Sequence, residues 1–391
     1  MAWQLPVTRP RVLHLIHKLD IGGAERQLLT SLSAFDRDRF DHRVGVLFQR
    51  GAIFEELAAT DLPCVEFGLR TRNVPGGIAR LVRYLRDERI DVIHAHLHLI
   101  AIYARIAARI AGTPVAIYTE HSDIARRQWI WRRIERALEP WTSYKVTVSE
   151  VQKTRTVALE GFPAEKVEWI KNSVPVDEFS PDPEIRRSRR EELGVPADAL
   201  VIGNISNMRY LKRLDLLIEA FEELARTRSD LWLLLVGDGA DKPRLDALRS
   251  QSAFAERIVM TGKRRDVADL LRAMDVFAIS SESEGLPINM LEAMAAGLPV
   301  VATRVGAIAD VIDDETSGLL LDAGDTARLQ HTLRRLVDEP ESRARLAEAG
   351  HRHVRAEYDA PVNSRRLEEI YARLLRRVLV DRIPGQDRAH S

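Results

Sequence analysis

Short apolar runs alternate with amphipathic stretches along almost the whole chain, and this alternation constrains the fold more than any other feature. In the first half, apolar runs that we interpret as buried strands lie at 11–17, 43–48, 64–67, 91–94, 115–119, 144–148 and 167–170. Helical patterns separate them, at 24–34, 78–89, 100–111 and 126–138. Strands with Val, Ile and Leu on consecutive positions are buried on both faces, which is typical of parallel sheets covered by helices.

A second series begins near residue 200, with strands predicted at 200–205, 231–236, 257–261, 276–280 and 300–303. Two such series predict two doubly wound α/β domains, and 391 residues are enough for two separate cores. Residues 172–196 contain four prolines and a charged run, so we interpret them as a linker with a boundary near residue 180. We therefore expect domains at 1–180 and 181–362, followed by a helix and tail over 363–391 that can cross back to the first domain.

Composition and charge exclude several classes of protein. The 58 basic and 58 acidic residues give zero net charge, which argues against a dedicated nucleic-acid binder. A single cysteine, Cys64, excludes an intrachain disulfide framework and a cysteine-based zinc site. We find no uncharged apolar run near the roughly 20 residues of a spanning helix, and residues 1–11 lack signal-peptide features. We expect a cytoplasmic protein.

Two glycines, Gly22 and Gly23, stand between the first predicted strand and its helix. Glycine there lets backbone amides approach an anionic or polyhydroxyl ligand, although a tight strand-to-helix turn would also use glycine. The spacing is not G-x-G-x-x-G, which argues against a dehydrogenase.

The most informative stretch is 280–294. A strand ends near residue 280, Glu284 and Gly285 follow in a loop, and Pro287 fits the first turn of a helix that carries Glu292. That helix would start beside the carboxyl ends of the second domain's strands, where open α/β sheets bind ligands. Its free amide groups suit a phosphate, and the two carboxylates suit sugar hydroxyls. The alternative is that both glutamates are solvated surface residues.

The run from Glu284 to Glu292 matches the E-x7-E motif of retaining nucleotide-sugar glycosyltransferases of family 4, and the chain resembles this family over nearly its whole length. Further matches are Gly-Gly-Ala-Glu at 22–25, Asp-Val-Ile-His-Ala-His at 91–96, Thr-Glu-His at 119–121, Asn-Ser-Val-Pro-Val-Asp at 172–177 and Val-Gly-Asp-Gly at 236–239. The resemblance implies the GT-B fold: two Rossmann-like domains facing a central cleft, with the acceptor largely on the first and the nucleotide sugar on the second.

Cations near a predicted helix start point to an anionic partner, because the helix dipole disfavours them there. Arg209 and Lys212 are such residues, and the resemblance implies that they hold the donor diphosphate together with the helix start at Gly285 and Leu286. The family often has glycine after the lysine, where this chain has Arg213.

The resemblance also implies roles for the remaining site residues. Glu292 would bind the ribose hydroxyls, and Glu284 would face the donor sugar or the developing positive charge. Gly22, Gly23 and His121 would close around the transferred sugar. The one Asp-x-Asp match, at 36–38, lies in a charged loop, so we expect no metal site and metal-independent transfer.

Two further patterns leave alternatives open. His94, His96 and His98 would share one face of a continued strand, as metal ligands can, although lining of the cleft by His96 is the better interpretation. The helical stretch 126–138 combines arginines with Trp129 and Trp131, which suits either an anionic membrane surface or a solvated packing helix.

The leading prediction is a retaining glycosyltransferase, without a cofactor, that moves a sugar from a nucleoside diphosphate sugar to a hydroxyl of a saccharide or lipid-linked acceptor. Surface polysaccharide or glycolipid synthesis at the inner face of the membrane is the expected setting. The alternatives are a nucleotide-sugar epimerase of similar fold and a non-catalytic nucleotide-sugar-binding protein.

Overall fold

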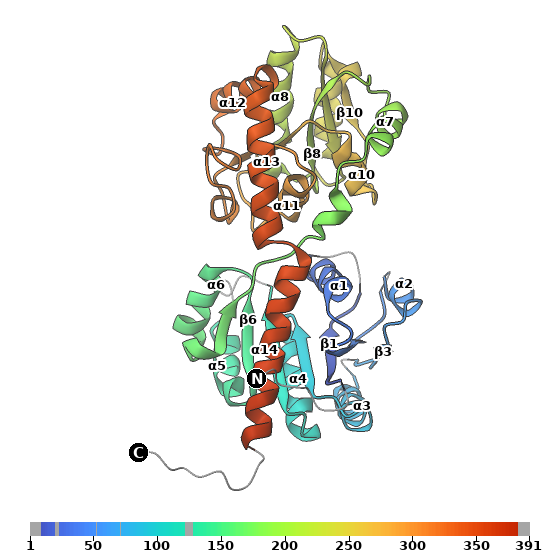
Figure 1. Ribbon diagram of the computed structural model, residues 1–391, viewed down its shortest axis with the longest axis vertical. Coiled ribbons are helices and arrows are strands. Elements are labelled where there is room, and N and C mark those ends of the chain that lie inside the picture. Colours follow the sequence, from blue (N-terminus) through green and yellow to red (C-terminus); the bar gives the residue numbers. More distant parts are fainter. Residues whose placement is uncertain (1–8, 20–22, 52, 71, 122–127, 382–391) are drawn as a thin grey trace. The chain divides into compact units, whose positions relative to one another are not determined.

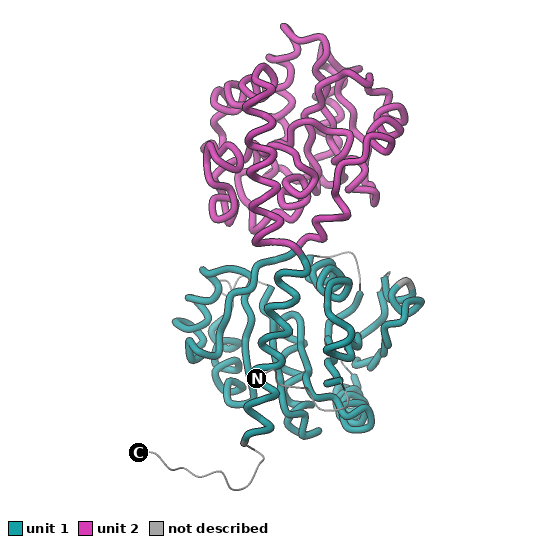
Figure 2. The backbone as a smooth tube through the Cα atoms, viewed as in Figure 1, with its two compact units in different colours: residues 1–173, 360–391 teal, residues 174–359 magenta. Residues whose placement is uncertain are grey.

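The computed structural model describes residues 9–19, 23–51, 53–70, 72–121 and 128–381 (Figure 1). The chain forms two compact units: unit 1 combines residues 1–173 with 360–391, and unit 2 comprises residues 174–359 (Figure 2). The division after Ser173 lies before the boundary expected at residue 180, and the C-terminal helix belongs to unit 1.

Unit 1 is built on a parallel sheet in the order β3-β2-β1-β4-β5-β6-β7. Its strands are β1 (Arg11–Ile16), β2 (Asp41–Val46), β3 (Cys64–Glu66), β4 (Val92–His96), β5 (Val115–Glu120), β6 (Tyr144–Thr147) and β7 (Val167–Trp169). Its α-helices are α1 (Gly23–Ala34), α2 (Phe54–Ala58), α3 (Val74–Asp87), α4 (His98–Ala111), α5 (Trp129–Leu138), α6 (Glu150–Arg155) and α14 (Ala360–Asp381).

Unit 2 contains a second parallel sheet in the order β10-β9-β8-β11-β12-β13. Its strands are β8 (Leu200–Ile205), β9 (Leu231–Val236), β10 (Ile258–Met260), β11 (Val276–Ile279), β12 (Val300–Thr303) and β13 (Leu319–Leu321). Its α-helices are α7 (Pro183–Glu192), α8 (Leu214–Ala225), α9 (Lys242–Gln251), α10 (Val267–Arg272), α11 (Ile288–Ala295), α12 (Thr326–Asp338) and α13 (Pro340–Glu357).

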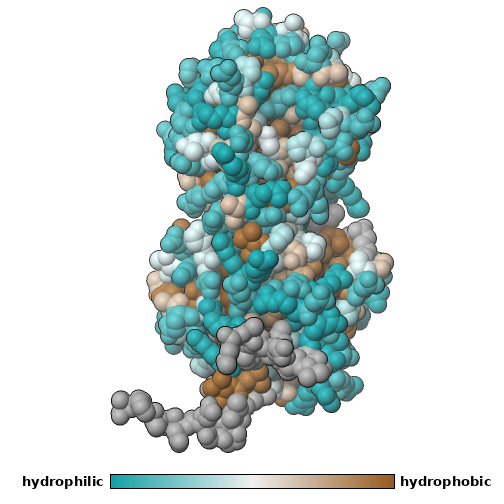
Figure 3. Space-filling view, viewed as in Figure 1, coloured by the Kyte–Doolittle hydropathy of each residue, from teal (hydrophilic) through white to brown (hydrophobic). Residues whose placement is uncertain are grey.

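Burial on both faces explains why the strands lack an alternating pattern. In β8, Leu200 and Ile202 pack into one apolar cluster with α8, whereas Val201 packs into the opposite cluster with α11 and α10. The prediction of two doubly wound α/β units is therefore confirmed. The outward surface of both units is mostly hydrophilic in the view of Figure 3.

Helix α14 closes one face of unit 1 (Figure 1). Ile370 and Leu374 join the cluster formed by α1 and the strands. The Glu368 carboxylate accepts hydrogen bonds from the Asp36 amide (2.6 Å) and the Arg39 guanidinium (2.9 Å).

Two segments differ from the sequence interpretation. The supposed linker contains helix α7, and the three-residue strand β13 was not expected. The basic helix α5 starts at Trp129, later than expected, because Gln128 at its N-cap has an extended backbone (φ −59°, ψ 147°); residues 122–127 lie outside the described part of the chain. None of the described helices combines the length and apolar character that a membrane-spanning segment requires.

Candidate active site

Each sheet has one point at which the strand order reverses, and ligands of open α/β sheets bind beyond the carboxyl ends of the strands there. In unit 2 this point lies between β8 and β11. Lys212 follows β8 and Glu284 follows β11, and the Lys212 ammonium lies 2.7 Å from both carboxylate oxygens of Glu284. The Ser281 hydroxyl donates a further hydrogen bond to Glu284 (2.6 Å), and the Glu284 side chain is only 9% exposed. The fold thus joins two predicted site residues that are 72 positions apart.

The neighbouring arginines have different roles. Arg209 is exposed and makes no ion pair among the described residues, so its guanidinium is available to an anion. Arg213 has φ +48°, in the left-handed region that glycine adopts without cost, which explains why glycine suits this position. Its guanidinium pairs with Asp215 (3.1 Å) and with Glu282. Arg213 is therefore engaged with carboxylates and is not a third available cation.

Helix α11 starts directly after Pro287, which occupies its N-cap position. Glu292 lies within this helix and is 2% exposed, so it is not the solvated surface residue of the alternative interpretation. Gly285 is exposed, whereas Leu286 is half-buried against the core of unit 2. The free amides of the α11 N-terminus are thus close in sequence to Glu284, the residue that Lys212 contacts.

Gly306 is a site residue that the sequence interpretation missed. It has φ +58°, and a Cβ atom there would meet the Glu284 carbonyl oxygen and lie 2.7 Å from that of Gly285. The Ala307 amide donates to the Gly285 carbonyl (2.9 Å), which fastens the same loop. A glycine shortly after a predicted strand was the available signal, but the loop that it contacts, at Glu284 and Gly285, lies 22 and 21 positions earlier in the chain.

We expect the Gly306→Ala substitution to displace the loop that carries Glu284. Since a shift of about 1 Å in a reacting group can reduce turnover about 10²-fold, activity should fall far more than stability. Gly324→Ala is the matched control, because Gly324 also has a left-handed φ (+81°) but its Cβ would meet no atom within 4 Å. Steady-state kinetics and thermal melts of both variants test this. Equal losses of activity would mean that the contact with Glu284 is unimportant.

A pocket of about 600 Å³ opens at the same edge of the unit 2 sheet, and its lining follows the carboxyl ends of β8, β9 and β10. Its polar lining residues are Ser206, Asn207, Asp238, Lys263 and Arg264. Gly237 has φ +139°, and a Cβ there would overlap the Ser206 carbonyl oxygen, so the close approach of these two loops requires glycine.

In unit 1, His96 and His121 line a small cavity of about 40 Å³ at the ends of β4 and β5. The Gln27 side chain, on α1, forms two hydrogen bonds with the backbone of Ser173. It donates to the Ser173 carbonyl (3.0 Å) and accepts from the Ser173 amide (2.7 Å). Burial lowers the pKa of His121 to about 4, although the neighbouring Glu120 opposes the shift. Gly23 is the exposed first residue of α1, and Gly22 lies outside the described residues.

The histidines of unit 1 form a hydrogen-bonded chain of rings. His14 Nε2 lies 3.0 Å from His42 Nδ1, His14 Nδ1 lies 3.5 Å from His96 Nε2, and His96 Nδ1 lies 3.5 Å from His121 Nε2. His94 lies beside this chain, and its two ring nitrogens bond the Thr119 hydroxyl and the Tyr371 hydroxyl, each at 2.6 Å.

The alternative grouping of His94 and His96 with His98, in the manner of metal ligands, does not form. His98 instead faces Glu135, at 3.0 Å, and His14 takes its place. One ring nitrogen from each of His14, His94 and His96 lies within 4.8 Å of the others, and no carboxylate joins this set among the described residues. The observed contacts fit buried, neutral imidazole rings that form hydrogen bonds with one another and with hydroxyl groups.

Two doubly wound parallel α/β units, one with a lysine–carboxylate pair at its switch point, define a protein of the GT-B fold class. Models of two families match the chain: "Glycosyl transferases group 1" over residues 185–353 and "Glycosyltransferase Family 4" over residues 21–178. The D-inositol 3-phosphate glycosyltransferase of Stackebrandtia nassauensis is 31% identical over 75% of this chain and 70% of its own length. The chain belongs to glycosyltransferase family 4.

Solved structures agree on the fold. Anabaena Alr3699/HepE in complex with UDP has a TM-score of 0.79 at 24% identity, covering 93% of this chain and 100% of that one. WaaG, a glycosyltransferase involved in lipopolysaccharide biosynthesis, has a TM-score of 0.65 at 18% identity, covering 92% and 99% of the two chains.

Proposed function

We propose that this glycosyltransferase transfers a sugar from a nucleoside diphosphate sugar to an acceptor hydroxyl with retention of anomeric configuration, in the synthesis of a surface polysaccharide or glycolipid. The observation that carries the proposal is the Lys212–Glu284 pair at the switch point of unit 2. It combines a cation for a diphosphate with a carboxylate for a sugar, beside an exposed and available Arg209. The UDP complex of the HepE neighbour and the WaaG neighbour's part in lipopolysaccharide biosynthesis support the donor class and the setting.

The residues suggest how the donor is held. The diphosphate lies against Arg209, Lys212 and the N-terminus of α11, where charge-assisted hydrogen bonds and free amides favour an anion. The Lys212 ammonium has three donors and so can bridge Glu284 and a phosphate oxygen. Glu292 binds the ribose hydroxyls, Glu284 faces the transferred sugar, and the nucleoside occupies the 600 Å³ pocket. These cations neutralise the leaving group, so transfer requires no metal ion.

Unit 1 contributes the acceptor side. His121, together with the glycines Gly22 and Gly23, contacts the transferred sugar. Because its pKa is lowered to about 4, His121 is neutral at pH 7 and can both donate and accept a hydrogen bond.

A thermal-shift panel of UDP-, GDP-, ADP- and dTDP-sugars, run both without and with EDTA, tests the donor class. A bound donor stabilises the native state, so we expect a rise in melting temperature for one base and little change for the others. No shift with any nucleotide sugar would remove the proposal, and a shift that disappears with EDTA would remove metal independence. Conversion of the donor to an epimer without an acceptor would identify an epimerase instead.

We also propose that unit 1 contacts an anionic membrane through helix α5. Trp129 and Ile130 are 67% and 46% exposed, the same helix carries Arg133 and Arg136, and Trp141 lies just after it with 43% exposure. Exposed aromatic residues beside cations suit the headgroup region of a bilayer. This would bring the enzyme to a lipid-linked acceptor at the inner face of the membrane.

Co-sedimentation with phosphatidylglycerol-containing vesicles tests the membrane contact. We expect binding at low salt that falls as salt rises, and a several-fold loss in a Trp129→Ser, Ile130→Ser double variant. Leu379→Ser, at an exposed position of α14 (43%), should not change it. Equal sedimentation with neutral vesicles, or no binding at low salt, would contradict the proposal.

A further inference from the structure

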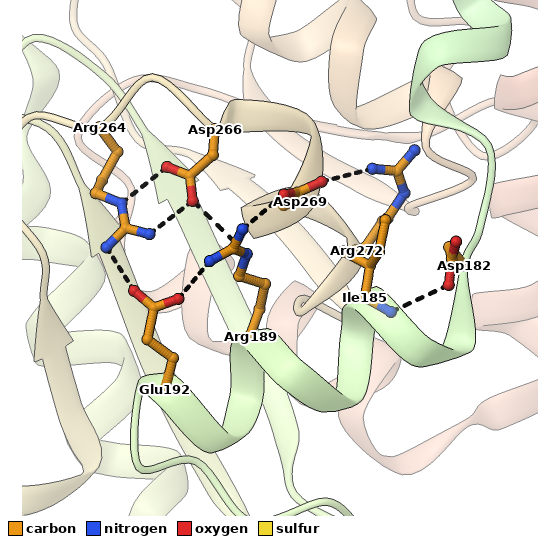
Figure 4. Close-up of polar contacts among 8 residues, drawn as sticks. All are labelled: Asp182, Ile185, Arg189, Glu192, Arg264, Asp266, Asp269 and Arg272. Carbon is orange, nitrogen blue, oxygen red and sulfur yellow. Dashed lines mark hydrogen bonds and ion pairs between the residues drawn. The ribbon is translucent and has the colours of Figure 1, made fainter.

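Arg264 stands at the edge of the unit 2 pocket, yet its donors point at protein carboxylates. Its Nε and Nη2 atoms donate to the two oxygens of Asp266, at 2.8 and 2.6 Å, and its Nη1 atom donates to Glu192 at 2.8 Å (Figure 4). Because three donors of the guanidinium fork are engaged, Arg264 is held as part of the pocket wall, unlike the available Arg209.

A second arginine fixes the carboxylates from the other side. Arg189, one turn before Glu192 on α7, donates to the second oxygen of Glu192 and to Asp269 on α10, the latter at 3.0 Å (Figure 4). Each oxygen of Glu192 therefore has its own arginine. The pKa values of Glu192 and Asp266 are both lowered, chiefly by hydrogen bonds from Arg264, so both carboxylates are charged at neutral pH.

The network continues to the start of unit 2. Arg272 donates to Asp269 (2.8 Å) and to the backbone carbonyls of Ser180 and Glu178. Helix α7 is thus fixed against α10 by alternating charges, and the loop that bears Arg264 lies directly before α10. The pocket wall also has a backbone connection, because the Gly237 amide donates to the Gly262 carbonyl (2.9 Å).

We propose that Glu192 and Asp266 are positioning residues for the nucleoside pocket: they hold Arg264 in the conformation that forms its wall and thereby set the affinity for the donor without touching it. We call Arg264, Asp266, Glu192 and Arg189 the α7 clamp. The inference rests on the proposed function, since it assumes that the pocket receives the nucleoside end of the donor. It gives helix α7, which the sequence presented as a linker, a part in substrate binding.

Calorimetric titration of the full chain with UDP, GDP, ADP and dTDP tests the clamp. We expect Glu192→Gln and Asp266→Asn each to raise the Kd of the tightest of these nucleotides about two- to fivefold, as expected for partly exposed charge pairs. The double variant should lose less than the product of the single effects, because both carboxylates act on one guanidinium. In kinetics KM should rise while kcat stays near the wild-type value.

Glu315→Gln is the matched control. Glu315 makes a comparable two-oxygen contact with Arg335 on α12, at 2.9 and 2.7 Å, but neither residue lines the pocket. Its Kd should equal that of the wild type. Unchanged Kd values in both clamp variants, or the same increase in Kd in Glu315→Gln, would overturn the positioning role of Glu192 and Asp266 but not the proposed function. Failure of the wild type to bind any of the four nucleotides would overturn the proposed function and the clamp together.

Discussion

Replacing Arg209 by alanine or Glu292 by glutamine is expected to lower kcat/KM for glycosyl transfer by about 10²-fold or more, while the protein remains folded. Arg209 is exposed and makes no ion pair among the described residues, so removing its side chain breaks no ion pair that stabilises unit 2. Glutamine keeps the shape of the buried Glu292 side chain, but it removes the negative charge and replaces one acceptor oxygen by an amide group that only donates hydrogen bonds. The effect should therefore appear in transfer rather than in folding.

Matched controls exist for both variants. Glu282→Gln changes a carboxylate two positions before Glu284 that pairs with Arg213, and Arg226→Ala removes an exposed arginine at the end of α8. Both should retain activity within about threefold. Initial rates and far-UV circular dichroism of the four variants check this, and near-normal turnover in Arg209→Ala and Glu292→Gln would rule out the donor site as assigned.

The histidine cluster should make unit 1 lose stability steeply in mild acid. Burial lowers the pKa of His42 to about 4 and that of His94 to about 3, and the pKa values of His14 and His96 lie well below the ordinary value of 6.5. Below pH 6.5 the unfolded chain binds protons that the folded chain excludes, so the free energy of unfolding falls as pH falls. The contribution of these neutral histidines to the free energy of unfolding is thus fully present above pH 6.5. It declines as the pH falls from 6.5 to their pKa values in the folded protein.

The size of this effect follows from about 1.4 kcal/mol per pH unit for each titrating group. At pH 5 His42 and His94 should each remove about 2 kcal/mol, and His14 and His96, whose pKa values are lowered too, act in the same direction against a typical domain stability of about 5–15 kcal/mol. We expect the hydrogen-exchange protection factors of β1 and β4, which correct for the intrinsic pH dependence of exchange, to fall between pH 7 and pH 5, while those of the unit 2 strands change much less.

A variant can assign the effect to the cluster. His42→Gln removes one titrating ring at the end of the chain of histidines, so the pH dependence of unit 1 stability should weaken by about one bound proton. Flat stability of the wild type between pH 7 and pH 5, or imidazole resonances of the buried histidines that titrate near pH 6.5, would contradict the prediction.

Much of the fold was predictable because the strands are apolar on both faces. The predicted limits of β8, β9 and β12 match the structure, and their residues are almost entirely buried. Helix α7 escaped detection because it docks through polar contacts. Its one buried residue is Arg190, whose guanidinium bonds the Ala273 carbonyl (3.0 Å) and Asp275 (2.7 Å). Hydrophobic periodicity has no signal for such a helix.

The site residues were predictable one at a time, but their pairing was not. Lys212 and Glu284 stood out from local sequence, whereas their contact depends on β8 and β11 being neighbours in the sheet. His14 gave no signal, since a lone histidine in an apolar strand looks like core, and only the pairing of β1 with β4 brings it to His94. Gly306 likewise needs the fold to reveal its contact with the Glu284 loop.

A crystal structure of the protein with the nucleoside diphosphate selected by the thermal-shift panel tests the donor site most directly. We expect density for the diphosphate within hydrogen-bond distance of Arg209, Lys212 and the amides at the start of α11, with the nucleoside in the pocket beside Arg264. A nucleotide bound elsewhere, with Lys212 still pairing Glu284 and that pocket unfilled, would contradict the assignment of unit 2 as the donor-binding unit.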